Sequence, residues 1–348
     1  MAMKLLNAVA VFGIFFIGDA ALGEWKIEVH PSVTAISSVS DCAKSQNEET
    51  RMEVEEWCTV TGGTIQNGIL NIPHSINGIA CRAIGADAFS GEALLTSISI
   101  DASVTTIEKG AFSDCSNLVS ITFGDMEHLF VSEGAFSNCR SLKDIAFPSG
   151  LMSIDEFAFS GCQSLKSVKL PPSCRIMGVT AFMNCFGLEK ADIGYAGRYL
   201  SSAFIGCTNL AEICVASSNE FLKVSNGVLY SKDDFLLIKF PPRLEVDRYV
   251  VNPSTEIISH CAFQCAGLKS IEFPPSLKLI GRGAFSCCTN LTSVVIPESV
   301  GLIDDHAFSM CSNLVSVIFK GDKRPEMGED AFPDGVMMKG GISDKCER

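Results

Sequence analysis

The sequence predicts a solenoid of parallel β-strands with short helical or 3₁₀ turns, made of about ten to eleven turns of 22–24 residues. The main observation is an Ala-Phe dipeptide that recurs ten times, with steps of 23, 24, 23, 23, 22, 59, 22, 23 and 24 residues between successive phenylalanines. A fixed period of this length indicates one supersecondary unit per repeat, which becomes stable by stacking on its neighbours. The phenylalanines are Phe89, Phe112, Phe136, Phe159, Phe182, Phe204, Phe263, Phe285, Phe308 and Phe332.

Two further columns of residues keep a fixed distance from the Ala-Phe pair. Four residues before each Ala stands an apolar residue that we expect to point into the core: Ile84, Ile107, Val131, Ile154, Met177, Tyr199, Ile258, Ile280, Ile303 and Met327. About three residues after the Phe comes a Cys that we interpret as a small buried hydrophobe able to donate to a nearby carbonyl. This column contains Cys115, Cys139, Cys162, Cys185, Cys207, Cys265, Cys288 and Cys311, of which Cys265 arrives one residue early.

A Leu stands three residues after most of these cysteines and opens the pattern L-x-x-I-x-I, as in Leu118, Ile121 and Phe123. Its closing alternation has the period of two that is typical of a strand with one buried face. Proline ends many of these strands, for example at Pro297, because it cannot extend a sheet ladder. A second short extended segment follows, with Leu277 and Ile280 facing inward in one copy. The Ala-Phe segment itself is expected to form one tight helical or 3₁₀ turn.

This repeat resembles the leucine-rich repeat of BspA-like surface proteins, I-G-x-x-A-F-x-x-C-x-x-L-x-x-I-x-I-P-x-x-V, which residues 280–303 show almost in full. The resemblance runs from about Gly62 to about Phe332. It implies an extracellular or surface-attached protein, because several members of the family are linked to adhesion and host interaction. The long 59-residue step is similar to an island that the family often carries, here Asn226 to Pro242.

The residues of the island by themselves predict a β-hairpin. The two strands are 227–230 and 235–240, joined by the polar turn 231–234. The chain then divides into a signal peptide (1–23), an acidic N-terminal leader or cap (24–61), a first block of repeats (62–213), an island segment (214–250), a second block of repeats (251–332) and a C-terminal tail (333–348).

Composition limits the class of partner. The 348-residue chain is 47% hydrophobic and 19% charged, with a formal net charge of -13, which disfavours nucleic acid or an anionic lipid surface as a partner. Lys4, the apolar run 5–17 and the small residues that end at Gly23 predict a secretory signal peptide. We therefore expect a secreted or extracellular protein without stable membrane insertion after cleavage, and leave surface association open.

The sequence offers little support for catalysis or metal binding. It contains no C-x-x-C pair and none of the common hydrolase, nucleotide-binding or metalloprotease motifs, so we predict no enzyme activity, no cofactor and no metal site. Because secretion permits disulfides, Cys42 and Cys58 are the most plausible pair to join the N-terminal cap. Asn290 lies in the only N-glycosylation acceptor pattern, although a structural role in its turn is the favoured interpretation.

Outward positions of the L-x-x-I-x-I strands are the candidate binding surface. Four lysines on consecutive turns predict a basic stripe: Lys143, Lys166, Lys169 and Lys190, next to Asp192. With Tyr230, Lys232, Asp233 and Asp234 of the island, this stripe is our candidate contact for a protein or glycan at a cell or matrix surface; a merely solvated face is the alternative. The predicted function is non-catalytic protein recognition or cell adhesion, and the second candidate is a soluble secreted scaffold or inhibitor with a specific protein client.

Overall fold

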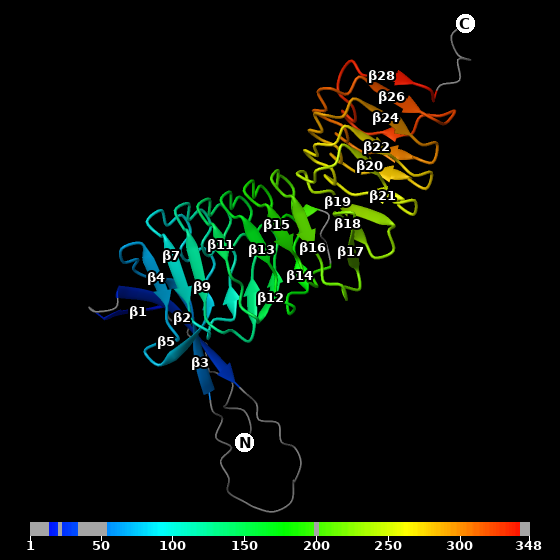
Figure 1. The fold of residues 1–348 in the computed structure, drawn as a ribbon. Helices are drawn as coiled ribbons and strands as arrows, with labels where there is room; N and C mark the ends of the chain where they lie inside the picture. Colours follow the sequence, from blue (N-terminus) through cyan, green and yellow to red (C-terminus); the bar gives the residue numbers. More distant parts are fainter. Residues whose placement is uncertain (1–13, 20–22, 34–53, 198–201, 342–348) are drawn as a thin grey trace, which may run out of the picture.

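The computed structural model describes residues 14–19, 23–33, 54–197 and 202–341. These residues form 28 β-strands that stack into a solenoid of about twelve turns, with no helical element among them (Figure 1). The Ala-Phe segments are single turns closed by hydrogen bonds three residues apart, such as Ser113 N to Gly110 O at 2.8 Å. Left-handed residues such as Gly110 and Asp114, with φ of 64° and 59°, keep these turns from extending into helices.

One face of the solenoid is made by the predicted L-x-x-I-x-I strands, which we call the L-x-x-I-x-I face. Neighbouring strands on this face are parallel and in register; Ile98, for example, lies opposite Ile121. Along each strand buried and more exposed residues alternate, which confirms the expected period of two. Its strands are β4 (Ile69–Ile72), β7 (Ser97–Ile100), β9 (Ser120–Phe123), β11 (Asp144–Ile145), β13 (Ser167–Lys169), β15 (Lys190–Asp192), β16 (Glu212–Cys214), β20 (Arg248–Val250), β22 (Ser270–Glu272), β24 (Ser293–Ile296), β26 (Ser316–Phe319) and β28 (Met337–Lys339).

The opposite face is made by the short strands that precede each Ala-Phe pair, and we call it the short-strand face. These strands also run parallel from turn to turn and form two sheets, one before and one within and after the island. Their inward residues include Ile107, Ile154 and Ile280, all fully buried. The strands are β6 (Ile79–Ile84), β8 (Thr106–Ile107), β10 (Leu129–Val131), β12 (Leu151–Ile154), β14 (Ile176–Met177), β19 (Leu236–Lys239), β21 (Ile257–Ile258), β23 (Leu279–Ile280), β25 (Leu302–Ile303) and β27 (Glu326–Met327), with β5 (Ser75–Ile76) beside β6.

The N-terminal end of the solenoid is covered by strands from the predicted signal and leader regions. Strand β1 (Ile14–Asp19) pairs antiparallel with β2 (Gly23–Val33), and β2 pairs antiparallel with β3 (Val54–Gly62). β3 then runs parallel to β6 and so joins the short-strand face. Ile27 and Val60 are buried in the first core, so the segment before the repeats contributes to packing.

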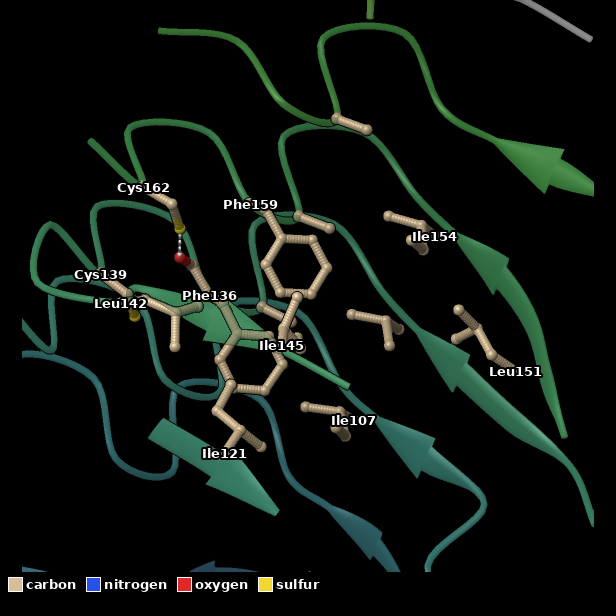
Figure 2. Packing of buried hydrophobic residues seen from close by; sticks show 14 of the residues in the cluster. Ile107, Ile121, Phe136, Cys139, Leu142, Ile145, Leu151, Ile154, Phe159 and Cys162 are labelled. Carbon is tan, nitrogen blue, oxygen red and sulfur yellow. Dashed lines mark hydrogen bonds between the residues drawn. The ribbon is translucent and has the colours of Figure 1, made fainter. Parts of the chain in front are cut away.

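A stack of phenylalanine rings runs through the core. Rings on successive turns lie parallel with centroids about 5 Å apart, for example 5.3 Å between Phe136 and Phe159. Each buried Cys of the predicted column donates from its Sγ to the carbonyl of a Phe in a preceding turn, as Cys162 does to Phe136 at 3.4 Å (Figure 2). The backbone also links neighbouring turns: Phe136 N donates to Ala158 O at 2.8 Å. The same three contacts recur from turn to turn and hold the copies in register.

Two members of the predicted columns are not in the core. Cys265 is partly exposed and has φ of 58°, since it occupies the left-handed turn position that Asn138 and Asp114 fill in other turns. Ala266, one residue later, takes the buried place of the cysteine. Met327 is 38% exposed because it lies in the last short strand, where no later turn covers it. Tyr199 lies outside the described residues.

The island separates two hydrophobic cores. The predicted hairpin is present as β18 (Val228–Ser231) and β19, and a third strand, β17 (Leu222–Ser225), pairs antiparallel with β18. Leu229 and Ile238 pack into the first core, whereas Tyr230 and Leu237 pack into the second. β18 and β19 are therefore buried on both faces, which explains their nearly continuous apolar sequence.

The island also contributes one further turn of the solenoid, which has no Ala-Phe dipeptide and so is missing from the Ala-Phe spacing. Phe240 stacks on Phe263 with ring centroids 4.9 Å apart and donates from its backbone N to Ala262 O, as the other phenylalanines of the column do. The 59-residue step is thus 36 residues from Phe204 to Phe240 plus 23 residues to Phe263. Lys239 takes the place of the usual Ala and is buried, with its Nζ donating to Cys261 O at 3.0 Å.

We predict that removing one ring from the middle of the stack destabilises the fold. Phe159→Ala should lower the free energy of unfolding by about 3–5 kcal/mol, because the ring is fully buried between two others. Phe157→Asn is the matched control: Phe157 is partly exposed and has φ of 56°, a conformation that Asn adopts more easily. Urea unfolding followed by circular dichroism measures both. Equal losses for the two variants would contradict the assignment of stability to the stack.

We predict that Lys239→Met stabilises the protein at pH 7 by about 1–3 kcal/mol. Burial lowers the pKa of Lys239 below its ordinary 10.5, so the folded state disfavours the ammonium that the unfolded chain accepts freely. This penalty is complete below the folded-state pKa and fades as the pH rises toward the ordinary value. The advantage of the variant over wild type in urea unfolding should therefore shrink between pH 7 and pH 10. An advantage that grows with pH would refute the assignment.

Candidate binding surfaces

The outward side of the L-x-x-I-x-I face changes its chemistry along the solenoid. Near the N-terminal end, β7 and β9 present small hydroxyl side chains: Ser97 lies opposite Ser120 and Ser99 opposite Thr122. Parallel pairing in register places equivalent positions of successive turns in straight rows. The surface is consequently a set of rows whose composition can be followed turn by turn.

The next zone, which we call the charged zone, carries the four lysines of the predicted stripe. Its charges are mixed. Lys166 Nζ lies 2.8 Å from Glu189 Oε1, and Lys190 Nζ lies 2.8 Å from Glu212 Oε1. The second pair raises the pKa of Lys190 and lowers that of Glu212 through their hydrogen bond.

The other two lysines of the stripe are exposed, but one of them also faces an acid. Lys169 is in register with Asp192 on the next strand, while Lys143 lies one turn before Lys166. The predicted basic stripe thus lies within a face of mixed charge, and two of its four lysines are paired with glutamates. The charges are mixed because acidic residues follow Lys166, Lys169 and Lys190 at the corresponding positions of the next turns.

The second block presents an apolar zone on the same face, which we define by Val250, Val295 and Ile318. These side chains are 56%, 38% and 41% exposed, and Val295 lies directly opposite Ile318 in parallel strands. Val315 and Met337, both more than half exposed, extend the zone toward the C-terminal end.

Charged pairs border the apolar zone, and Glu272 of one pair lies within it, directly opposite Val250 in the parallel pairing of β20 and β22. Lys269 Nζ lies 2.9 Å from Asp247 Oδ2, and Arg248 pairs with Glu272. An exposed apolar group with a charged border is typical of a protein-interaction site. A groove of about 600 Å³ is lined by Gly267 and by loop 242–247, which leads into β20.

The island contributes less to the surface than the sequence suggests. Tyr230 is buried, and its hydroxyl lies 2.7 Å from that of Tyr249, so it is not available to a partner. Lys232 and Asp233 are exposed in the turn between β18 and β19, and hydrogen bonds from Ser231 and Phe235 lower the pKa of Asp233. Asp234 is engaged with Lys223 at 2.7 Å. Of the four island residues predicted to bind, Lys232 and Asp233 are thus the exposed ones.

Two buried thiols of the core column, Cys115 and Cys162, are poor nucleophiles. Burial raises the pKa of Cys115 to about 11 and that of Cys162 to about 12, so both stay protonated near neutral pH. Cys58 is also fully buried, and its Sγ lies 3.6 Å from the Sγ of Cys81. Cys42, its predicted disulfide partner, lies outside the described residues.

Other candidate groups are placed on the surface or in turns. Asn290 is exposed, and its Nδ2 donates to Gly267 O at 2.9 Å, as Asn313 does to Thr289 O one turn later. The described part of the chain contains no group of three or more His, Cys, Asp or Glu residues arranged to hold a metal ion. No helix in the same part is long and apolar enough to cross a membrane.

Comparison with known proteins identifies the repeat. The sequence profile of the BspA type leucine rich repeat region, in six copies, matches residues 82–211, 130–250 and 243–339. The chain belongs to this family. Together the matches cover residues 82–339. No curated protein sequence matches the chain.

Solved structures of bacterial leucine-rich-repeat proteins share this fold. A leucine rich cell surface protein from Faecalibacterium prausnitzii is 21% identical, with a TM-score of 0.61 over 95% of this chain and 96% of that one. The pneumococcal vaccine antigen PcpA is 18% identical, with a TM-score of 0.62 over 94% and 85% of the two chains. A leucine-rich repeat protein from Bacteroides ovatus is 23% identical, with a TM-score of 0.52 over 89% and 79%.

We predict that the neighbouring cysteines 287 and 288 differ sharply in reactivity. Cys287 is partly exposed, whereas Cys288 is buried with its pKa raised and its Sγ donating to Phe263 O at 3.0 Å. Brief treatment of the native protein with iodoacetamide at pH 8 should alkylate Cys287 and leave Cys288 free until the protein is unfolded. Fragment-ion mass spectrometry distinguishes the two positions. Equal labelling of both in the native state would contradict the core assignment.

Proposed function

We propose that this protein is a secreted or cell-surface recognition protein that binds a protein partner on the L-x-x-I-x-I face and catalyses no reaction. The observation that carries the proposal is the apolar zone of Val250, Val295 and Ile318, exposed in the middle of a regular strand face. Exposed apolar side chains on a rigid concave or flat scaffold are typical of sites that another protein covers.

The charge pattern supports a protein over an acidic glycan as the partner. Two of the four lysines in the predicted stripe are already paired with glutamates, and a third lies beside an aspartate. A polyanion would find little net positive charge there, because each pair cancels its own field beyond about a Debye length of 8–10 Å. A partner with its own apolar centre and mixed charges fits both zones.

Secretion is supported by the N-terminal sequence and by the nature of similar proteins. Residues 1–23 have the features of a signal peptide, and the F. prausnitzii protein of similar fold is named as a cell surface protein. The family also supports a protein-binding surface as the general role. Adhesion to a cell or matrix surface is the specific form of this role that we propose.

A secreted scaffold or inhibitor with one specific protein client is the second candidate. The same apolar zone favours it, since such a protein would also cover a site on its client through this face. A binding screen of residues 24–348 against cell surfaces, arrayed matrix proteins and glycans separates the two. Saturable surface binding supports adhesion, whereas binding to a single soluble protein supports the scaffold.

We predict that charges introduced into the apolar zone weaken partner binding. Val295→Asp combined with Ile318→Asp should weaken binding at least about tenfold, because a desolvated carboxylate at the centre of an interface costs more than 1.4 kcal/mol. Surface plasmon resonance against the partner found in the screen gives the dissociation constants.

Two controls make this test specific. Val295→Thr with Ile318→Thr keeps the strand propensity and should retain most of the affinity. Reversal of Lys143, Lys166, Lys169 and Lys190 to Glu tests the charged zone separately, and we expect it to change affinity less than the Asp pair does. Loss of binding in the lysine reversal alone, with equal thermal stability in all variants, would move the site to the charged zone.

A further inference from the structure

A pair of cysteines lies where the N-terminal strands meet the first repeat. Cys58 belongs to β3, which closes the end of the solenoid, and Cys81 belongs to β6, the first short strand of the repeats. The two residues are direct partners in the parallel pairing of β3 and β6. Their sequence positions are 23 residues apart, so one covalent bond here would tie the cap to the first turn.

The geometry suits a disulfide. Adjacent strands lie about 4.8 Å apart, which falls within the range of about 4.4–6.8 Å that Cα atoms of bridged cysteines adopt. The two Sγ atoms are already 3.6 Å apart and point into the same core. Because the Cα separation already suits a bridge, changes of the side-chain torsions bring the two sulfurs to bonding distance.

The repeat itself does not require a cysteine at either position. Cys81 stands eight residues before its Phe, outside the Cys column that follows the Phe and donates to a carbonyl of the preceding turn. Four other turns place a buried branched aliphatic side chain at the corresponding position, Val104, Leu151, Leu277 and Val300, and one places another buried cysteine, Cys174. Packing alone would therefore be satisfied by valine or leucine at 81.

We propose that Cys58 and Cys81 form a disulfide that fastens the N-terminal cap to the repeats. The bond forms by exchange with the disulfide of an oxidised thiol–disulfide oxidoreductase. One thiolate attacks a carrier sulfur to give a mixed disulfide, and the second thiolate displaces the reduced carrier. The two cysteines lose two protons and two electrons, and the carrier disulfide becomes a dithiol. Because both sulfurs are buried in the folded chain, the exchange precedes closure of the cap.

The role of the bond follows from its place at an end of the stack. The hairpin of β2 and β3 that caps the stack joins the repeats through β6 only, so it opens more readily than a central turn. A bridge between β3 and β6 restrains this opening. Formation of the bond in the cell rests on the proposed secretion, because disulfides persist in oxidising compartments.

Peptide mapping tests the pairing directly. The reduced, unfolded full chain is refolded in a mixture of oxidised and reduced glutathione, alkylated without reduction and digested with trypsin. Cys58 and Cys81 fall in one peptide, residues 52–82, whereas Cys42 falls in peptide 27–44. We expect peptide 52–82 two hydrogens lighter than its sequence mass and free of alkyl groups. Further cleavage after Leu70 should give two fragments that separate only on reduction.

Two results would overturn the proposal. One is alkylation of both cysteines after refolding to the native circular dichroism spectrum; the other is a cross-link between peptides 27–44 and 52–82, which would assign Cys58 to Cys42. The variant Cys42→Ser should leave the bridge intact. Protein secreted by an expression host forms a second arm: a bridge in the refolded protein but not in the secreted one would reject the cellular oxidation while keeping the pairing.

A stability measurement shows whether the bond restrains the cap. Reductant should lower the Tm of the wild-type protein by several degrees and leave Cys58→Val/Cys81→Val unchanged. Valine fits the core at equivalent positions, so this variant is expected to fold. An equal effect of reductant on both proteins would contradict a structural role for this pair.

Discussion

Hydrogen bonds between consecutive Ala-Phe segments are the constraint on which the rest of the structure depends. Phe136 N reaches Ala158 O, and the Cys162 thiol reaches Phe136 O, with the same contacts in most other turns. They fix the separation of the phenylalanine rings at about 5 Å and keep each turn in register with the next. Because the register is fixed in the core, outward residues also fall into rows. The binding surface is thus a consequence of how the core stacks.

The island interrupts this pattern without breaking the solenoid. Pro242 occupies the position that Cys265 holds in the next turn. The backbone N–H of Cys265 donates to Ser286 O, whereas a proline has no N–H to donate. Lys239 replaces the small Ala of the pair and brings a charge into the same region. The ring stack ends at Phe204 and begins again at Phe240, and strands buried on both faces separate the two cores. Along the chain, the charged zone lies before the island strands and the apolar zone lies after them.

The two ends of the solenoid are finished differently. At the N-terminal end β3 extends the short-strand face and buries Cys58 and Val60 against the first repeats. At the C-terminal end β28 completes the L-x-x-I-x-I face, while the last short strand stays uncovered and Met327 is partly exposed. At the first end the Sγ atoms of Cys58 and Cys81 lie 3.6 Å apart, on either side of the junction between the cap and the repeats.

The sequence by itself determined the solenoid, its period, its core columns and the face on which outward residues lie, because a fixed spacing of apolar residues is a local property of each repeat. The dipeptide Asn226-Gly227, with φ of 49° and 78°, is also typical of the two-residue turn that joins β17 and β18 in a hairpin. Only the tertiary structure decided that Lys166 meets Glu189, that Tyr230 is buried and that Cys58 faces Cys81. These contacts join residues on different strands. They depend on the register between turns, which the backbone hydrogen bonds set and no single repeat encodes.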